Sequence, residues 1–193
     1  DSWILIRDKG KLKIKRFNVV GTGGQCLMMP PKSDGYDYPY VLYNLGGCLA
    51  NLFLALISIA LYMILSPNIY ISAILIISFV IGLIFALING IPMQIGGISN
   101  DGNNILALKK DKEARRAFYL QLYINGLLAS GIRLKDMPEE YFELAENADL
   151  NNPLICAIGA FKSNYLHDRK DFDEAKNNSL YLLEEASGLL EVH

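Results

Sequence analysis

The pattern of hydrophobic and polar positions is dominated by one long run without charge. Residues 38–100 contain no Asp, Glu, Lys, Arg or His. A helix that crosses a membrane needs about 20 predominantly apolar residues, and shorter apolar runs are typical of soluble cores. The run predicts two antiparallel spans, over about residues 43–65 and 69–88, joined by a short turn at residues 66–68 (S-P-N). The alternative is a very long buried hairpin in a soluble protein.

Residues 1–31 show the pattern of β-strands, within an N-terminal region expected over residues 1–37. An apolar run at residues 3–6 precedes a turn signal at residues 8–10 (D-K-G), and residues 11–17 then alternate lysine with apolar side chains. A third short strand is expected over residues 25–29. We expect a membrane-associated β region here. Because Asp1 opens directly onto a strand-like segment, we also expect the natural N-terminus to lie further upstream.

Charged residues are again frequent in residues 109–193. Their pattern with the apolar residues predicts a cytosolic helical domain. An amphipathic helix is expected over about residues 114–128, ending before Gly131. Further helices are expected to begin at Pro138, at Pro153 and at about residue 171, and the last should run to about residue 186.

Two short segments of this helical domain repeat. Residues 135–137 (K-D-M) recur as residues 170–172 (K-D-F), a spacing close to the 34 residues of a tetratricopeptide repeat. Each copy would join the two helices of one pair, although Glu140 stands where the second copy has Ala175. We therefore expect a mainly α membrane protein with a tetratricopeptide-like C-terminal domain.

Flanking cations predict the orientation of the hairpin. Lysine and arginine are frequent in residues 7–32 and in residues 109–116, whereas the predicted tip carries no charge. Cytoplasmic flanks of membrane spans are enriched in these cations. Both ends of this chain are therefore expected in the cytoplasm, in a multi-pass protein of the cell membrane.

Composition agrees with a chain whose charge is segregated. The protein has 193 residues, of which 52% are hydrophobic and 20% are charged, and its mean hydropathy is +0.23. The net charge of −2 averages unlike regions, and no nucleic-acid partner is expected. Cys26, Cys48 and Cys156 are odd in number and widely spaced, so they predict neither a disulfide framework nor a zinc ribbon.

Polar residues interrupt the apolar run near both of its ends. Gly46, Gly47 and Asn51 lie early in the first span, and residues 89–92 (N-G-I-P) end the second. An amide within a bilayer is costly unless protein or water satisfies it. Asn51 and Asn89 therefore face either a neighbouring helix or a polar cavity, and the spans alone leave both interpretations open.

Residues 91–104 cannot continue a membrane helix. They contain two glycines at residues 96–97 and the run N-D-G-N-N at residues 100–104. Irregular backbone at membrane depth is tolerated only where protein or a water-filled cavity surrounds it. Asp101 is the first acid after the uncharged run. It is either a functional carboxylate, the N-cap of a following helix or a loop acid at the membrane surface.

Taken in order, these segments resemble the site-2-type intramembrane zinc metalloproteases. Residues 47–51 (G-C-L-A-N) look like the G-P-x-x-N-like motif of that family's second span. Residues 89–92 look like the N-x-x-P motif of its third span, and residues 101–102 like the aspartate–glycine pair that follows. Residues 21–31 are similar to the segment after the β-sheet in Gram-positive bacterial members. The resemblance covers about residues 1–108 and implies a bacterial membrane protease.

The resemblance implies roles for three residues. In that family an H-E-x-x-H helix supplies two histidine ligands and a general base, and a carboxylate completes the zinc site. By resemblance Asp101 is that third ligand. Asn51 and Asn89 would contact the unwound substrate backbone or the oxyanion. The β region would offer a strand edge to a membrane-anchored protein substrate.

Three features depart from the family pattern. No H-E-x-x-H is present, and His167 and His193, the only histidines, lie in the helical tail. The stretch from Asn89 to Asp101 is longer than the family motif, and Cys48 replaces its proline. The chain as given cannot build a zinc site, so either H-E-x-x-H lies upstream or the protein is an inactive relative.

Three functions therefore stand beside one another. The chain is the C-terminal part of a protease, or a catalytically dead relative whose tail docks a protein partner, or a two-span anchor for a helical-repeat adaptor. An upstream H-E-x-x-H on an apolar segment would favour the first over the second. The third gives no reason for N-x-x-P and Asp101 at the cytosolic end of a span.

Overall fold

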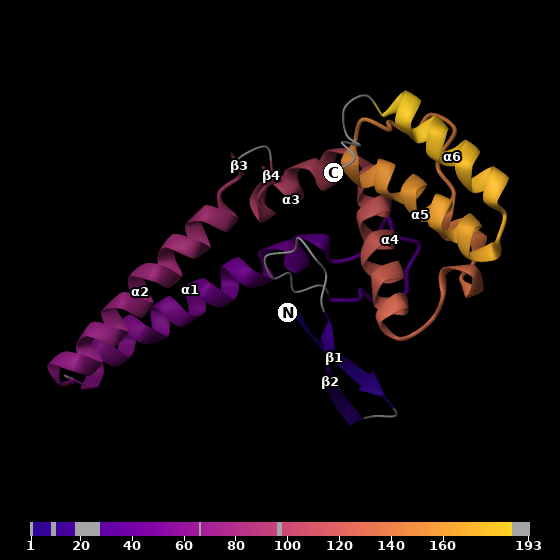
Figure 1. The fold of residues 1–193 in the computed structure, drawn as a ribbon. Helices are drawn as coiled ribbons and strands as arrows, with labels where there is room; N and C mark the ends of the chain where they lie inside the picture. Colours follow the sequence, from indigo (N-terminus) through magenta and orange to yellow (C-terminus); the bar gives the residue numbers. More distant parts are fainter. Residues whose placement is uncertain (1, 9–10, 18–27, 66, 96–97, 187–193) are drawn as a thin grey trace. The chain divides into compact units, whose positions relative to one another are not determined.

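The structure is a computed structural model, and it describes residues 2–8, 11–17, 28–65, 67–95 and 98–186 (Figure 1). These residues are mainly helical. They form two compact units, one over Pro39–Lys112 and one that joins the segment up to Tyr38 with the chain from Glu113 onward. The expected third strand at residues 25–29 lies largely outside the described residues.

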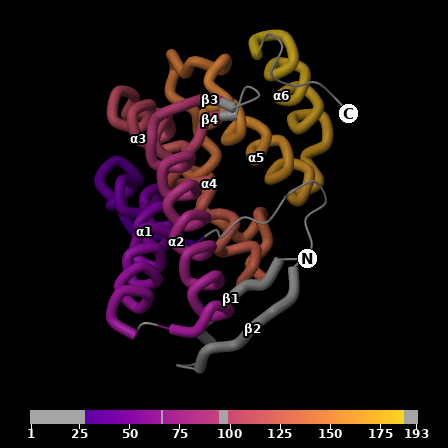
Figure 2. The backbone as a smooth tube through the Cα atoms, turned by 90° about the vertical axis from the view of Figure 1, so that its left-hand side faces the viewer, coloured from indigo at the N-terminus to yellow at the C-terminus, as the bar shows by residue number. Residues whose placement is uncertain are grey.

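The first unit is built on two long antiparallel helices, α1 (Tyr40–Leu65) and α2 (Ile69–Gly90), which lie side by side (Figures 1 and 2). Their most apolar 18-residue windows have mean hydropathies of 2.4 and 3.0. Both helices are thus long enough and apolar enough to cross a membrane. They correspond to the two expected spans and extend slightly beyond them. The side chain of Asn68 caps α2 by accepting a hydrogen bond from the Ile71 amide.

Small residues allow α1 and α2 to pack closely. A Cβ atom built on Gly82 would lie 2.9 Å from the carbonyl oxygen of Asn51 and 3.1 Å from Cβ of Ala55. Cys48, Ala55 and Ser58 are buried along α1. Close backbone approach through small residues is the usual way in which helices associate in lipid.

The outer surfaces of α1 and α2 are apolar and exposed. Phe53 and Ile74 are 65% and 63% exposed, and within α2, all of whose residues are described, only Gly82 is buried. A core hairpin of a soluble protein would bury this surface. Ser58 and Asn44 bond to the carbonyls of Leu54 and Tyr40 one turn earlier, so these polar groups are satisfied within the helix.

A short irregular segment follows α2 and leads to a third helix. Strands β3 (Gln94–Ile95) and β4 (Ile98–Ser99) pair antiparallel. The helix α3 (Asp101–Lys110) then packs back against α1 and α2, and Leu108 is fully buried. The sequence predicted that residues 91–104 cannot continue the apolar helix. In the structure α2 ends at Gly90, and the β3–β4 pair and α3 follow it.

The second unit contains three α-helices, α4 (Lys112–Ala129, whose first residue belongs to the other unit), α5 (Pro153–Arg169) and α6 (Phe172–Glu185). Two 3-10 turns, η1 (Leu134–Asp136) and η2 (Glu139–Phe142), lie between α4 and α5. Two strands, β1 (Ser2–Asp8) and β2 (Lys11–Phe17), pair antiparallel in the backbone, with Ser2 opposite Phe17.

The helix expected to begin at Pro138 is not formed. The chain makes only the turns η1 and η2 there, and η2 ends after four residues. Asp149 then accepts a hydrogen bond from the Asn151 amide, which is a local alternative to helical bonding. Only α5 and α6 form a helical pair, so the expectation of two such pairs is wrong, and the tetratricopeptide-like domain is not confirmed.

An extended segment fastens onto α4. This segment, residues 28–38, is called the strap below. The hydroxyl of Tyr119 accepts a hydrogen bond from the Ser33 amide (2.8 Å) and donates one to the Pro31 carbonyl (3.3 Å). Gly35 has a φ of +86°, and a side chain there would approach the Tyr119 ring to 2.9 Å. The strap thus belongs to the same unit as the C-terminal helices.

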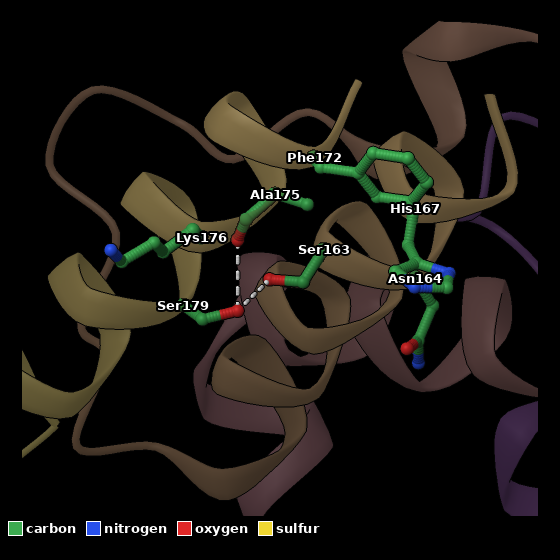
Figure 3. Close-up of a pocket in the computed structure, with 7 residues that line it drawn as sticks. All are labelled: Ser163, Asn164, His167, Phe172, Ala175, Lys176 and Ser179. Carbon is green, nitrogen blue, oxygen red and sulfur yellow. Dashed lines mark hydrogen bonds between the residues drawn. The ribbon is translucent and has the colours of Figure 1, made fainter. Parts of the chain in front are cut away.

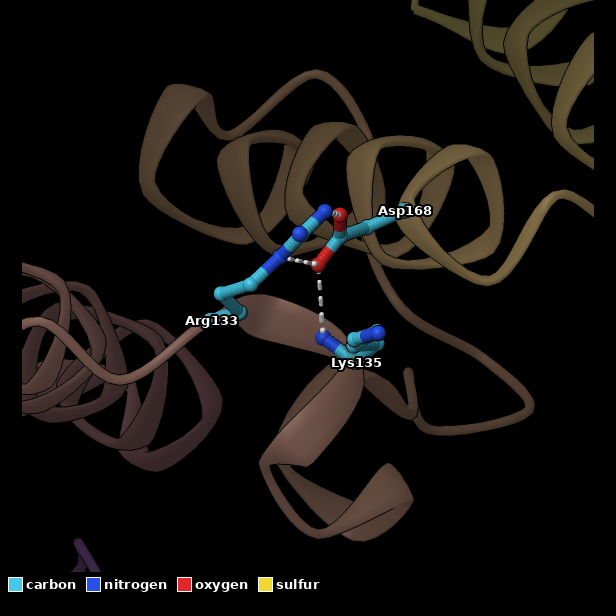
Figure 4. Close-up of polar contacts among 3 residues, drawn as sticks. All are labelled: Arg133, Lys135 and Asp168. Carbon is cyan, nitrogen blue, oxygen red and sulfur yellow. Dashed lines mark hydrogen bonds and ion pairs between the residues drawn. The ribbon is translucent and has the colours of Figure 1, made fainter.

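An ion pair connects η1 with α5 (Figure 4). The guanidinium of Arg133 binds the carboxylate of Asp168, which also accepts a hydrogen bond from the Lys135 amide at 3.2 Å. These bonds hold the pKa of Asp168 below its ordinary value, with the Arg133 hydrogen bond as the largest cause.

Candidate functional site

The candidate site is centred on Asp101, the first residue of α3. Its side chain is half-buried, and its Oδ2 atom lies 4.0 Å from Sγ of Cys48 on α1. Cys48 is only 5% exposed. Burial raises the pKa of the Asp101 carboxyl above its ordinary value. Asp101 is thus held against a buried face of α1.

Asn100 forms the connection that places Asp101. Its Oδ1 accepts hydrogen bonds from the amides of Met93 (3.1 Å) and Asn103 (3.0 Å). Its Nδ2 donates to the carbonyls of Ile88 (2.5 Å) and Ile91 (2.6 Å) at the end of α2. One side chain therefore joins the end of α2, the segment after Pro92 and the first turn of α3.

Gly102 allows α3 to approach the end of α2. A Cβ atom built there would overlap the carbonyl oxygen of Gly90 and would lie 3.0 Å from the nitrogen of Pro92. Gly90 in turn faces Cys48, with 3.8 Å between a built Cβ and the thiol sulfur. The aspartate–glycine pair thus has a steric reason, since only glycine fits directly after Asp101.

The structure does not join the two predicted asparagines to this cluster. Asn51 is half-buried on α1, one turn after Cys48, and Asn89 is half-buried in the last turn of α2. Among the described residues no hydrogen bond links either amide to Asp101. Their roles toward a substrate stay predictions.

The structure changes two interpretations that the sequence suggested for residues 100 and 101. Asp101 is not the N-cap of α3, because the side chain of Asn100 occupies that position and bonds to the amide of Asn103. Asn100 was also missed as a site residue. The signal was present, since asparagine directly before the first residue of a helix is among the strongest N-cap preferences.

The described residues do not complete a zinc site. A catalytic zinc ion needs three protein ligands and one open position, and this cluster offers the carboxylate of Asp101 and the thiol of Cys48. No group of three His, Cys, Asp or Glu side chains that could hold a metal occurs within the described ranges. His167 lies on α5 in the other unit. Asp101 can serve as one anionic oxygen ligand and no more.

A groove lies between α5 and α6 (Figure 3). It is an open groove of about 320 Å³. Ser163 and Ser179 bond to each other across it at 3.0 Å, and Ser179 also reaches the Ala175 carbonyl. The ring of His167 packs against Phe172 with 5.1 Å between centroids. These groups serve the packing of the helical pair, so the groove offers no catalytic arrangement.

Comparisons with protein-family models, with curated proteins and with solved structures give no match for this chain. The resemblance to the intramembrane metalloproteases therefore depends on the order of the sequence motifs alone.

Proposed function

We propose that this chain is the C-terminal part of an intramembrane zinc metalloprotease that hydrolyses peptide bonds of membrane-anchored proteins. The observation that supports this most is the position of Asp101. The carboxylate is drawn inward against Cys48 at the end of two apolar helices, whereas a surface acid after a simple anchor would gain nothing from burial.

A membrane setting for the hairpin fits its surface. The apolar side chains of α1 and α2 face outward, and lipid is the solvent that stabilises such a surface. Cations flank the hairpin on both sides, and its tip carries none. Both flanks would then be cytoplasmic, and Asp101 would sit near the cytoplasmic boundary of the bilayer.

The residues of this chain would contribute one ligand and the surroundings of the site. Asp101 would hold zinc, which when bound polarises a peptide carbonyl and activates water. The other ligands, an H-E-x-x-H pair by resemblance, would come from outside the given sequence. Asn51 and Asn89 would contact an unwound substrate, and the β1–β2 hairpin would add a substrate strand at its edge. The helical tail would engage a further protein partner.

The test compares Asp101→Ala with the matched variant Asn103→Ala in the full-length protein in membranes. Zinc content and cleavage of a tethered reporter are measured together. We expect about one zinc in the wild type, loss of cleavage in Asp101→Ala, and wild-type behaviour in Asn103→Ala, with all three proteins in the membrane fraction. Undiminished cleavage by Asp101→Ala would reject the ligand assignment.

One observation favours a second candidate, a membrane-anchored binding module without catalysis. The given sequence carries no H-E-x-x-H, the motif that an active protease of this family needs. This module would bind a protein partner through its helical unit. Full-length protein that holds no zinc and cleaves nothing, yet retains a partner through residues 113–186, would decide for it.

A further inference from the structure

We propose that Asn100 is a positioning residue, which fixes Asp101 against α1 by supplying the Ile88 carbonyl at the end of α2 with the hydrogen bond that Pro92 cannot donate. The proposal relies on the proposed function only for the role of Asp101. The placement itself follows from the hydrogen bonds around the helix break.

The end of α2 has carbonyl groups that the helix cannot satisfy. In an α-helix the carbonyl of residue 88 would accept the amide of residue 92, but Pro92 has no N–H. The Ile88 carbonyl is therefore left without its helical partner, next to an apolar surface where an unpaired backbone group is costly. Nδ2 of Asn100 supplies the missing hydrogen bond and also reaches the carbonyl of Ile91.

The other half of the same amide fixes the segment that carries Asp101. Oδ1 of Asn100 bonds to the Met93 and Asn103 amides, and the Asn100 backbone N–H donates to the Met93 carbonyl at 3.1 Å. Asp101 follows Asn100 directly and therefore has little freedom. The fit of Gly102 on Gly90 adds a steric stop, and the Asp101 carboxylate meets Cys48 as a result.

Capping alone does not explain the residue type. An N-cap needs only a side-chain oxygen, and serine caps a helix about as well as asparagine. The hydrogen bonds to Ile88 and Ile91 need an amide donor. Asn100→Ser therefore keeps the cap of α3 and loses the connection to α2, whereas Asn100→Ala loses both. A capping role and a positioning role thus predict different results for the serine variant.

The distance between α1 and residue 101 gives a direct measurement. The full chain, in lipid vesicles, carries Cys26→Ser and Cys156→Ala, retains Cys48 and has Asp101→Cys. Dibromobimane becomes fluorescent when it bridges two neighbouring thiols, so its signal reports how often residue 101 lies beside Cys48. We expect a strong signal with Asn100 present, and a loss of about fivefold in Asn100→Ser and in Asn100→Ala, as removal of such hydrogen bonds implies. Asn103→Ala, which removes the amide that bonds to Ser99, should leave the signal unchanged.

Each outcome decides the proposal. A loss in both Asn100 variants supports it. A loss in Asn100→Ala alone would show that Asn100 is only a cap, and an unchanged signal in both would also overturn the proposal, as would a parent protein without any signal. The zinc and cleavage assay of Asp101 is independent. If Asp101→Ala cleaves normally while the bimane signal depends on Asn100, the protease function fails and the positioning role stands.

Discussion

At the scale of single residues, Gly102 is the position where a side chain is least tolerable. The built Cβ overlaps the Gly90 carbonyl, which is backbone and cannot rotate away. We expect Gly102→Ala to push α3 off α2 and to destabilise the hairpin unit by roughly 1–3 kcal/mol, the usual range for overpacking. Thermal unfolding in detergent measures this as a lower midpoint.

Gly47→Ala is the matched control for this prediction. Gly47 is also a helical glycine, but no described atom outside its own stretch of helix lies within 4 Å of a Cβ built there. Alanine should be neutral or slightly stabilising at such a position, because it favours helix by up to about 1 kcal/mol over glycine. Equal midpoints for Gly102→Ala and Gly47→Ala would contradict the close packing of α3 on α2.

Asp168 should make the stability of the helical unit depend on pH. Its pKa is lowered in the folded state by Arg133 and by the Lys135 amide. The unfolded chain therefore binds more protons at acidic pH, so the stabilisation is present above the ordinary carboxyl pKa of about 4 and is lost as pH falls below it. We expect Asp168→Asn to lower the unfolding midpoint at pH 7, and the difference from the wild type to shrink as pH falls below the ordinary carboxyl pKa and through the lowered pKa of Asp168. Glu184→Gln, an exposed change on α6, should show no such difference.

At the scale of elements, the sequence predicted what depends on local pattern. Apolar runs predicted the two long helices α1 and α2. Asn152 as N-cap and Pro153 in the first turn predicted the start of α5, and the turn before α6 was expected as well. The wrongly expected helix at Pro138 shows the limit. The apolar residues of this segment do reach the core, since Phe142 is fully buried. The segment forms two 3-10 turns against α5 in place of a helix.

The candidate site was predictable only in part, for the same reason. Motif order pointed to Asp101, which lies beside Cys48 in the structure. The role of Asn100 depends on the Ile88 carbonyl, which Pro92 leaves without its helical partner, and on the β3–β4 pair, which brings residue 100 back to residue 88. Such contacts arise between elements, and the period of a single element carries no signal for them.

The strap and α4 form an element pair that no sequence pattern indicated. The buried hydroxyl of Tyr119 fastens the backbone of Ser33 and Pro31. We expect Tyr119→Phe to leave the Ser33 amide without its partner and to free the strap. Trypsin cleavage after Lys32, which is exposed, should become about fivefold faster, the factor for one lost hydrogen bond of about 1 kcal/mol.

Tyr123→Phe controls for the loss of a tyrosine hydroxyl from the same helix. Its ring stacks on Tyr119 at 5.6 Å, but no hydrogen bond within the described residues joins its hydroxyl to the strap. Cleavage after Lys32 should keep its wild-type rate. If both variants are cleaved alike, the strap is held by ring packing and the Tyr119 hydroxyl adds nothing.

At the scale of the whole molecule, the decisive property is which parts of the chain water can reach. The cations on both sides of the hairpin predict that residues 66–68 lie outside the cell while Lys110, exposed at the end of α3, faces the cytoplasm. Single cysteines test this in a background of Cys26→Ser, Cys48→Ala and Cys156→Ala. A membrane-impermeant maleimide added to intact cells should label Ser66→Cys and spare Lys110→Cys, and permeabilised cells should label both. Labelling of Lys110→Cys in intact cells would show the opposite topology, with Asp101 away from the cytoplasmic side.

Extraction with alkaline carbonate tests whether the chain is an integral membrane protein at all. Release of the chain without detergent would mean that protein covers the apolar surface of α1 and α2, and it would contradict the assignment of both helices to the membrane.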